Sequence, residues 1–127
     1  MLERFLLVFA AGGLGAAARY AVGLWAFPRF GTAFPVGTLI VNVVGCFLMA
    51  VVMQTALQVS NFPPNLRLTL ATGFMGGLTT YSSFNYETTT LLRDGSLHTA
   101  LLYFGLTVAG CFFAGLLGFA LVRLFTA

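Results

Sequence analysis

Four long apolar runs dominate the sequence and leave little room for anything else. They cover residues 5–27, 38–59, 66–92 and 99–125, and each has at least the ~20 residues that a helix needs to cross ~30 Å of hydrocarbon. Glycine, proline and asparagine separate the first three runs, and the turn residues Arg93, Asp94 and Gly95 precede the last. The pattern predicts an all-α membrane protein with one domain, residues 1–127, built from four transmembrane helices.

Composition supports a membrane protein and argues against several other classes. The 127 residues are 59% hydrophobic and only 7% charged, whereas about a quarter of the residues of a soluble domain are charged. The six basic residues are arginines that punctuate the apolar runs without forming a basic patch, so nucleic acid is not an expected partner. The sequence shows no paired carboxylates, no nucleophile beside a base and no Walker motif, so it does not predict an enzyme.

The third run carries unusual polarity in its middle, where residues 73–84 read GFMGGLTTYSSF. Residues 66–76 lie before the centre of this segment and residues 82–92 lie after it, and each half rises roughly 16 Å as a helix, so the segment lies near the bilayer midplane. Gly76 and Gly77 favour a helix break there. A break frees carbonyl groups, which suit a small hard cation, and N–H groups, which suit an anion. A kinked helix without a ligand is the alternative.

Aromatic and hydroxyl side chains surround the expected break. Tyr81 and Phe84 are three residues apart, so one helix face presents the edges of both rings, which carry positive partial charge. Hydroxyl groups flank the rings at Thr79, Thr80, Ser82 and Ser83. In the last run Tyr103, Thr107 and Cys111 follow at four-residue steps and form a narrow polar stripe. The stripe is either a helix-packing face or one wall of an anion path.

Two polar residues in the first two runs have more than one interpretation. Arg19 either extends its charge to the membrane interface or provides a fixed positive charge that attracts anions to a vestibule. Asn42 either joins two helices through hydrogen bonds or donates its amide N–H groups to an anion. Cys46 and Cys111 have no metal-ligand neighbour in the sequence, and we expect them to be small buried hydrophobic residues.

The charges give almost no preference for one orientation in the membrane. With four spans, Arg4, Arg67 and Arg123 share one side and Arg29 and Arg93 share the other. Such a small bias does not select a direction. Insertion in both orientations would permit an antiparallel homodimer, similar to the inverted repeats of larger transporters. The alternative is that five charges are too few to count.

Three motifs together resemble the CrcB/Fluc family of fluoride channels. They are GLGAAAR in the first run, GTLIVN in the second and GFMGGLTTYSSF in the third. The resemblance covers essentially the whole chain. It implies passive export of fluoride through two antiparallel pores in a dual-topology homodimer. It also implies a location in the cell (inner) membrane and one structural sodium ion at the dimer centre.

The resemblance also assigns roles by position. It implies that the backbone carbonyls of Gly76 and Thr79 hold the sodium ion, and that Arg19 is the vestibule arginine. The implied anion pathway consists of Asn42, Tyr81, Ser82, Phe84, Tyr103, Thr107 and Cys111. Tyr81 stands where the family usually has phenylalanine, and Cys111 where serine is common, so these two departures concern the conduction rate.

Two functions from other classes are weighed against a fluoride channel. A small dual-topology multidrug antiporter needs a membrane-embedded carboxylate in its core, whereas the first run offers Arg19 and Glu87 lies late in the third. A structural subunit that only packs helices leaves the freed backbone near Gly76 unexplained. The polar residues and the expected helix break indicate a pathway for a small anion beside a cation site. The choice of fluoride comes from the family resemblance.

Overall fold

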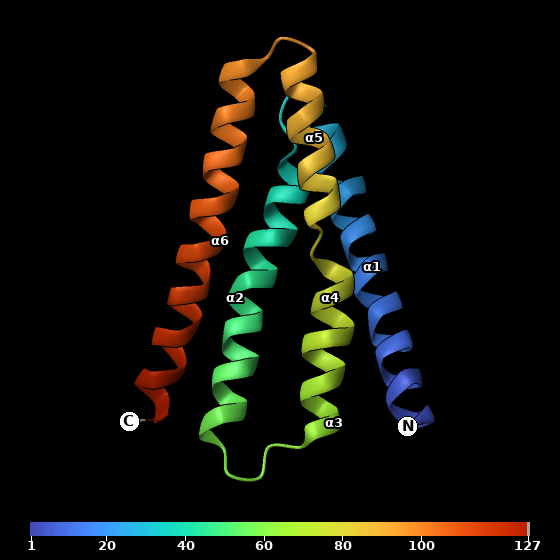
Figure 1. Ribbon diagram of the computed structural model, residues 1–127, viewed down its shortest axis with the longest axis vertical. Helices are drawn as coiled ribbons and strands as arrows, with labels where there is room; N and C mark the ends of the chain where they lie inside the picture. The colour runs from blue at the N-terminus through green and yellow to red at the C-terminus, as the bar shows by residue number, and fades with distance from the viewer. Residues whose placement is uncertain (127) are drawn as a thin grey trace.

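The computed structural model describes residues 1–126, and the side chains of residues 1–125. All regular structure in this part of the chain is helical (Figure 1). The elements are α1 (Leu2–Phe30), α2 (Val36–Gln58), α3 (Pro64–Arg67), the π-helix η1 (Leu68–Met75), α4 (Gly76–Leu78), α5 (Tyr81–Arg93) and α6 (Leu97–Thr126). Elements α3 to α5 follow one another along a single path, so the chain crosses the bundle four times (Figure 1). The predicted all-helical architecture is confirmed.

Three of the four crossings are continuous helices. α1, α2 and α6 are long and apolar enough to cross a membrane. The other crossing is divided into two halves, residues 64–78 and α5, and each half rises roughly 20 Å. Both termini lie at the end of the bundle that also holds the loop before α3 (Figure 1). This topology places Arg4, Arg67 and Arg123 at one end and Arg29 and Arg93 at the other.

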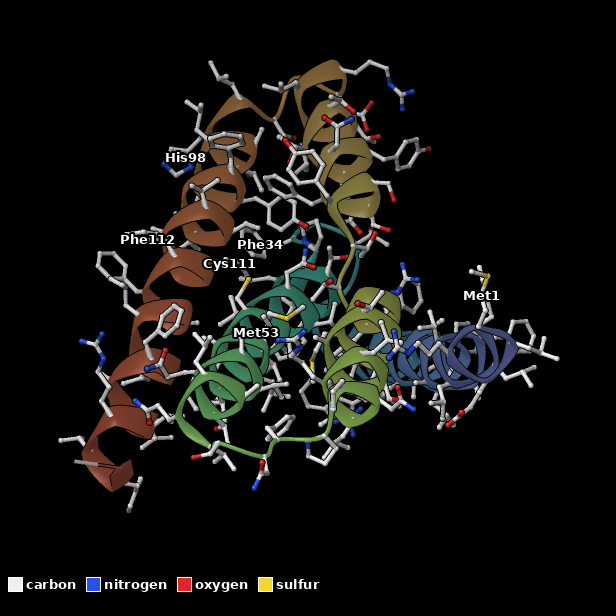
Figure 2. The ribbon with its side chains drawn as sticks, turned by 60° about the horizontal axis from the view of Figure 1, so that its bottom comes forward. Met1, Phe34, Met53, His98, Cys111 and Phe112 are labelled. Carbon is white, nitrogen blue, oxygen red and sulfur yellow. The ribbon has the colours of Figure 1, made fainter. Side chains whose placement is uncertain are left out.

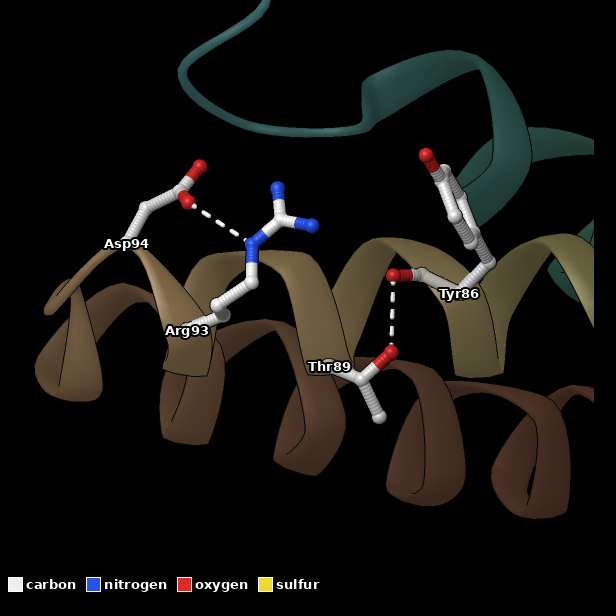
Figure 3. A network of polar contacts seen from close by, with 4 residues as sticks. All are labelled: Tyr86, Thr89, Arg93 and Asp94. Carbon is white, nitrogen blue, oxygen red and sulfur yellow. Dashed lines mark hydrogen bonds and ion pairs between the residues drawn. The ribbon is translucent and has the colours of Figure 1, made fainter.

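A polar turn joins α5 to α6. The Arg93 Nε lies 3.2 Å from Asp94 Oδ1, and the Thr89 hydroxyl donates to the Tyr86 carbonyl at 3.0 Å (Figure 3). Gly95 has φ of 80°, a left-handed conformation that glycine adopts without steric cost. The turn is short, and the side chains of its ion pair are exposed. α6 follows it and packs beside α5 and α2.

The buried core lies where α2 packs against η1 and α4. Val41, Met75 and Leu78 form its centre, and Ala18 and Val22 of α1 pack against them. Among the buried polar side chains of the described residues, Asn42, Thr80 and Thr107 lie at the division, whereas Gln54 lies further along α2.

The predicted interruption of the third span is present, but it lies further along the chain than the glycine pair. Gly76 keeps helical angles, with φ −61° and ψ −36°, and Gly77 lies inside α4. The backbone becomes extended at Thr79 and Thr80, with ψ of 154° and 111°. A Cβ on Gly77 would collide with the carbonyl oxygen of Gly12. Gly77 therefore permits the close approach of α4 to α1. This contact, and not a helix break, explains the glycine at this position.

Candidate functional site at the helix break

The side chain of Asn42 makes the hydrogen bonds that the backbone lacks at the break. Its Oδ1 accepts a hydrogen bond from the Thr80 N–H at 2.7 Å, and its Nδ2 donates to the Thr80 carbonyl at 3.0 Å. In a continuous helix the Thr80 N–H would donate to the Gly76 carbonyl. Asn42 is buried, so no water in the surrounding core replaces these two bonds. The Asn42 amide on α2 thus pairs with the Thr80 N–H and carbonyl groups, which a continuous helix would pair within itself.

Two backbone carbonyls remain free as a result. Within the described residues, no hydrogen bond reaches the carbonyl oxygen of Gly76 or of Thr79. The Thr79 N–H and the Thr79 hydroxyl both donate backward to the Met75 carbonyl, at 3.0 Å and 2.9 Å. The Thr79 methyl group fits against Gly45 of α2, where a Cβ would collide with it. The side chain is therefore fixed, and the free oxygens belong to the backbone.

The start of α5 offers hydrogen-bond donors at the same place. Thr80 is the N-cap, and its Oγ1 accepts from the Ser83 N–H at 3.1 Å. The Ser82 hydroxyl lies 3.2 Å from the Thr80 hydroxyl. The N–H groups of the first helical turn have no partner inside the helix and carry positive partial charge. An α5 of 13 residues therefore presents its positive end to the break.

A cavity of about 280 Å³ opens beside the break. Its lining consists of Asn42, Cys46, Thr79, Thr80, Tyr81, Phe84, Thr107, Val108 and Cys111. The Thr107 Oγ1 is buried and has no hydrogen-bond partner within the described part of the chain. The Tyr103 hydroxyl lies close enough to interact with Thr107, but it donates its own proton to Glu87. A buried hydroxyl without a partner is uncommon, and it points to a ligand that the cavity receives.

Aromatic rings form one wall of this cavity. Phe84 is 4% exposed and makes edge contacts with Tyr81 and Tyr103, with ring centroids 5.6 Å and 5.4 Å apart. Tyr103 is fully buried, whereas Tyr81 is 77% exposed in the single chain. In T-shaped contacts the ring planes are steeply inclined to each other, so some ring edges, which carry positive partial charge, remain available to an anion. The wall is incomplete at Tyr81.

Glu87 is the functional candidate that the sequence interpretation missed as part of the site. Its Oε1 accepts from the Thr38 hydroxyl at 2.7 Å, and its Oε2 accepts from the Tyr103 hydroxyl at 2.6 Å. Glu87 also lines a separate cavity of about 290 Å³ near the loop that joins α1 to α2. The signal was its spacing, since Glu87 follows Phe84 by three residues and shares its helix face. The carboxylate thereby connects the aromatic wall to the outer cavity.

The structure gathers most of the predicted pathway residues but separates two of them from the cavity. Five line the cavity, namely Asn42, Tyr81, Phe84, Thr107 and Cys111. Tyr103 lies directly behind Phe84, and Ser82 contacts the Thr80 hydroxyl without lining the cavity. Arg19 is half-buried on α1, one turn beyond Gly15, whose backbone abuts Leu78. Arg19 is therefore level with the break on the far side of the divided crossing.

Comparison with known proteins identifies the family of this chain. The family model described as "CrcB-like protein, Camphor Resistance (CrcB)" matches residues 6–119. A "Fluoride-specific ion channel FluC" of Anaeromyxobacter sp. (strain K) is 52% identical over 122 residues, which are 96% of this chain and 97% of the relative. Relatives of the same name from Prosthecochloris aestuarii and Sorangium cellulosum are 48% and 43% identical, over 99% and 96% of this chain. They are covered over 100% and 96% of their own lengths.

The family likeness and the helices agree on the broad class. The match runs from the first to the last crossing, and three helices are long and apolar enough to span a membrane. The chain is a multi-pass membrane protein, and it belongs to the CrcB family.

Proposed function

We propose that this chain is a fluoride-specific ion channel that lets fluoride leave the cell passively. The observation that carries the proposal is the cavity at the break, where the donor groups and ring edges of three helices converge. Relatives at up to 52% identity bear the name of a fluoride-specific ion channel over nearly the full length of this chain. A channel of this kind carries out no covalent step, so the site needs no nucleophile or base.

Fluoride is small and strongly hydrated, so its path must replace lost water with hydrogen-bond donors. Asn42 uses one of its two Nδ2 hydrogens on Thr80 and keeps the other for the ion. The Thr107 hydroxyl has its proton available, and the first turn of α5 adds N–H groups. Larger halides are less strongly hydrated and fit these close donors poorly, which favours fluoride over chloride.

The working unit that we propose is an antiparallel homodimer. Gly76 is exposed with open space around its Cα, and Tyr81 is largely exposed although it belongs to the cavity wall. A second copy would complete the wall and cover both residues. Labelling of Ser60→Cys, in a background without the native cysteines, should mark about half of the protein from each side of the membrane. One-sided labelling would contradict the antiparallel arrangement.

The free carbonyls at the break suit a structural sodium ion. Carbonyl oxygens are the ligands that hard cations prefer. Gly76 and Thr79 supply two such oxygens in each chain, so two copies on a shared axis would supply four. The ion would fix the two breaks against each other and contribute positive charge near the anion path. Gly76 and Thr79 fit the ion, because their carbonyl oxygens accept no hydrogen bond within the described chain.

The direct test of the function is anion efflux from proteoliposomes that contain the purified protein. We expect fast fluoride efflux under a fluoride gradient and little chloride efflux under a matched chloride gradient. Equal efflux of the two anions would contradict fluoride specificity. Proton-coupled uptake of an organic cation, with no fluoride efflux, would instead support the multidrug antiporter.

A further inference from the structure

The two cysteines of the chain lie on helices that pack against each other. Cys46 is on α2 and Cys111 is on α6, and both side chains line the same cavity at the helix break. Figure 2 shows Cys111 pointing from α6 toward α2. The sequence predicted small buried hydrophobic residues without a ligand neighbour along the chain, and it gave no sign that the fold brings the two cysteines to the same cavity.

Both cysteines line two cavities. One is the cavity at the helix break, and the other is a groove of about 450 Å³ that also reaches Phe112 and Gly115. Both cysteines are free and half-buried, so an ion that enters either space reaches the two sulfur atoms. The Thr107 hydroxyl, which has no hydrogen-bond partner in the described chain, lines the same break cavity.

We infer that Cys46 and Cys111 form a binding site for a soft metal ion that accepts two ligands, such as Cu(I) or Ag(I). Thiolates select soft ions. A closed zinc site needs four ligands, whereas no group of three or more His, Cys, Asp or Glu residues is placed to hold a metal in the described chain. Binding releases the two thiol protons and forms two sulfur–metal bonds, with no change of oxidation state. The product is a complex of net charge −1.

A bound ion would stop anion flow, a consequence that rests on the proposed fluoride channel. The complex would occupy the cavity between Asn42 and Thr107, and its negative charge would repel an approaching anion. Neither the family name nor the fluoride-binding donors require this site, because a serine at either position would keep a hydroxyl donor and lose the soft ligand.

Silver nitrate in chloride-free buffer is the probe for the site. Native mass spectrometry of the purified protein should show one tightly bound silver ion per chain. In Cys46→Ser and Cys111→Ser the affinity should fall by more than the roughly 10–100-fold that loss of an outer-shell partner costs a metal site. Unchanged silver affinity in both variants, or no binding to the wild-type protein, would overturn the inference.

Efflux from proteoliposomes tests the consequence, with each variant compared with its own silver-free rate. Silver should stop fluoride efflux by the wild-type protein, and both serine variants should keep their silver-free rates. Stoichiometric silver binding without any effect on wild-type efflux would overturn the proposed block. Silver binding by a protein that never conducts fluoride would refute the proposed function and leave the metal site supported, so the two failures are distinguishable.

Discussion

Replacement of Asn42 by leucine tests whether one amide maintains the helix break. Leucine has a similar size and fits the apolar surroundings, but it removes the acceptor of the Thr80 N–H and the donor to the Thr80 carbonyl. Each buried backbone group left without a partner costs about 1–3 kcal/mol. If the break keeps its shape, the variant loses about 2–6 kcal/mol of the free energy of unfolding.

The variant can avoid part of this loss only by restoring the helix. The Thr80 N–H would then donate to the Gly76 carbonyl, which removes one of the free oxygens at the break. Either outcome lowers fluoride efflux, since the variant also lacks the amide N–H offered to the ion. A lost hydrogen bond to a charged partner, at about 1.5–3 kcal/mol, alone corresponds to a roughly 10- to 150-fold slower rate.

The assay combines fluoride efflux with an unfolding titration in detergent, and Asn65→Leu is the matched control. Asn65 also makes two side-chain hydrogen bonds, to Arg4 and Glu3, but both are exposed at the end of the bundle. We expect the control to change stability by less than about 1 kcal/mol and to leave efflux intact. Wild-type stability of Asn42→Leu together with lost efflux would refute the role of Asn42 in holding the break, and wild-type efflux would refute its role as a donor.

Three further outcomes follow from the same geometry. Phe84→Ile keeps an apolar side chain but removes the ring edge, so fluoride efflux should fall at least tenfold, whereas Phe9→Ile on the exposed face of α1 should leave efflux unchanged in the same liposome assay. Gly77→Val forces side-chain atoms into the Gly12 carbonyl and should lower the stability measured in the unfolding titration by roughly 1–3 kcal/mol or more, and unchanged stability would contradict the close contact of α4 with α1. Replacement of sodium by a larger cation in both compartments should slow fluoride efflux, while tracer sodium should not move with fluoride. Stoichiometric sodium transport would exclude a structural ion.

Much of the architecture could be predicted because the bilayer imposes simple rules on a chain. Apolar runs of sufficient length must be helices, and a polar segment at the midplane must find partners inside the protein. Tyr103, Thr107 and Cys111 converge with Phe84 because four-residue spacing fixes one face of a helix. These inferences need only periodicity and length.

The position of the break and the partners of the polar groups depended on contacts between helices, which local sequence does not encode. Gly77 looked like a break because glycine is flexible, but its role is to admit the backbone of Gly12. Asn42 was given two alternatives, and the structure shows hydrogen bonds between helices while leaving one N–H free. The contacts of Glu87 with Thr38 and Tyr103 join residues far apart in the sequence, so no local pattern announced them.

The most direct test of the central claim is Thr107→Val, measured for both fluoride efflux and stability. Valine has nearly the shape of threonine and removes only the hydroxyl, which is buried without a partner in the described chain. If the hydroxyl donates to a permeating fluoride ion, efflux should fall roughly 10- to 150-fold. The stability of the variant should stay the same or rise, because no internal hydrogen bond is lost. Wild-type fluoride efflux by Thr107→Val would contradict the assignment of the cavity at the break as the path of the ion.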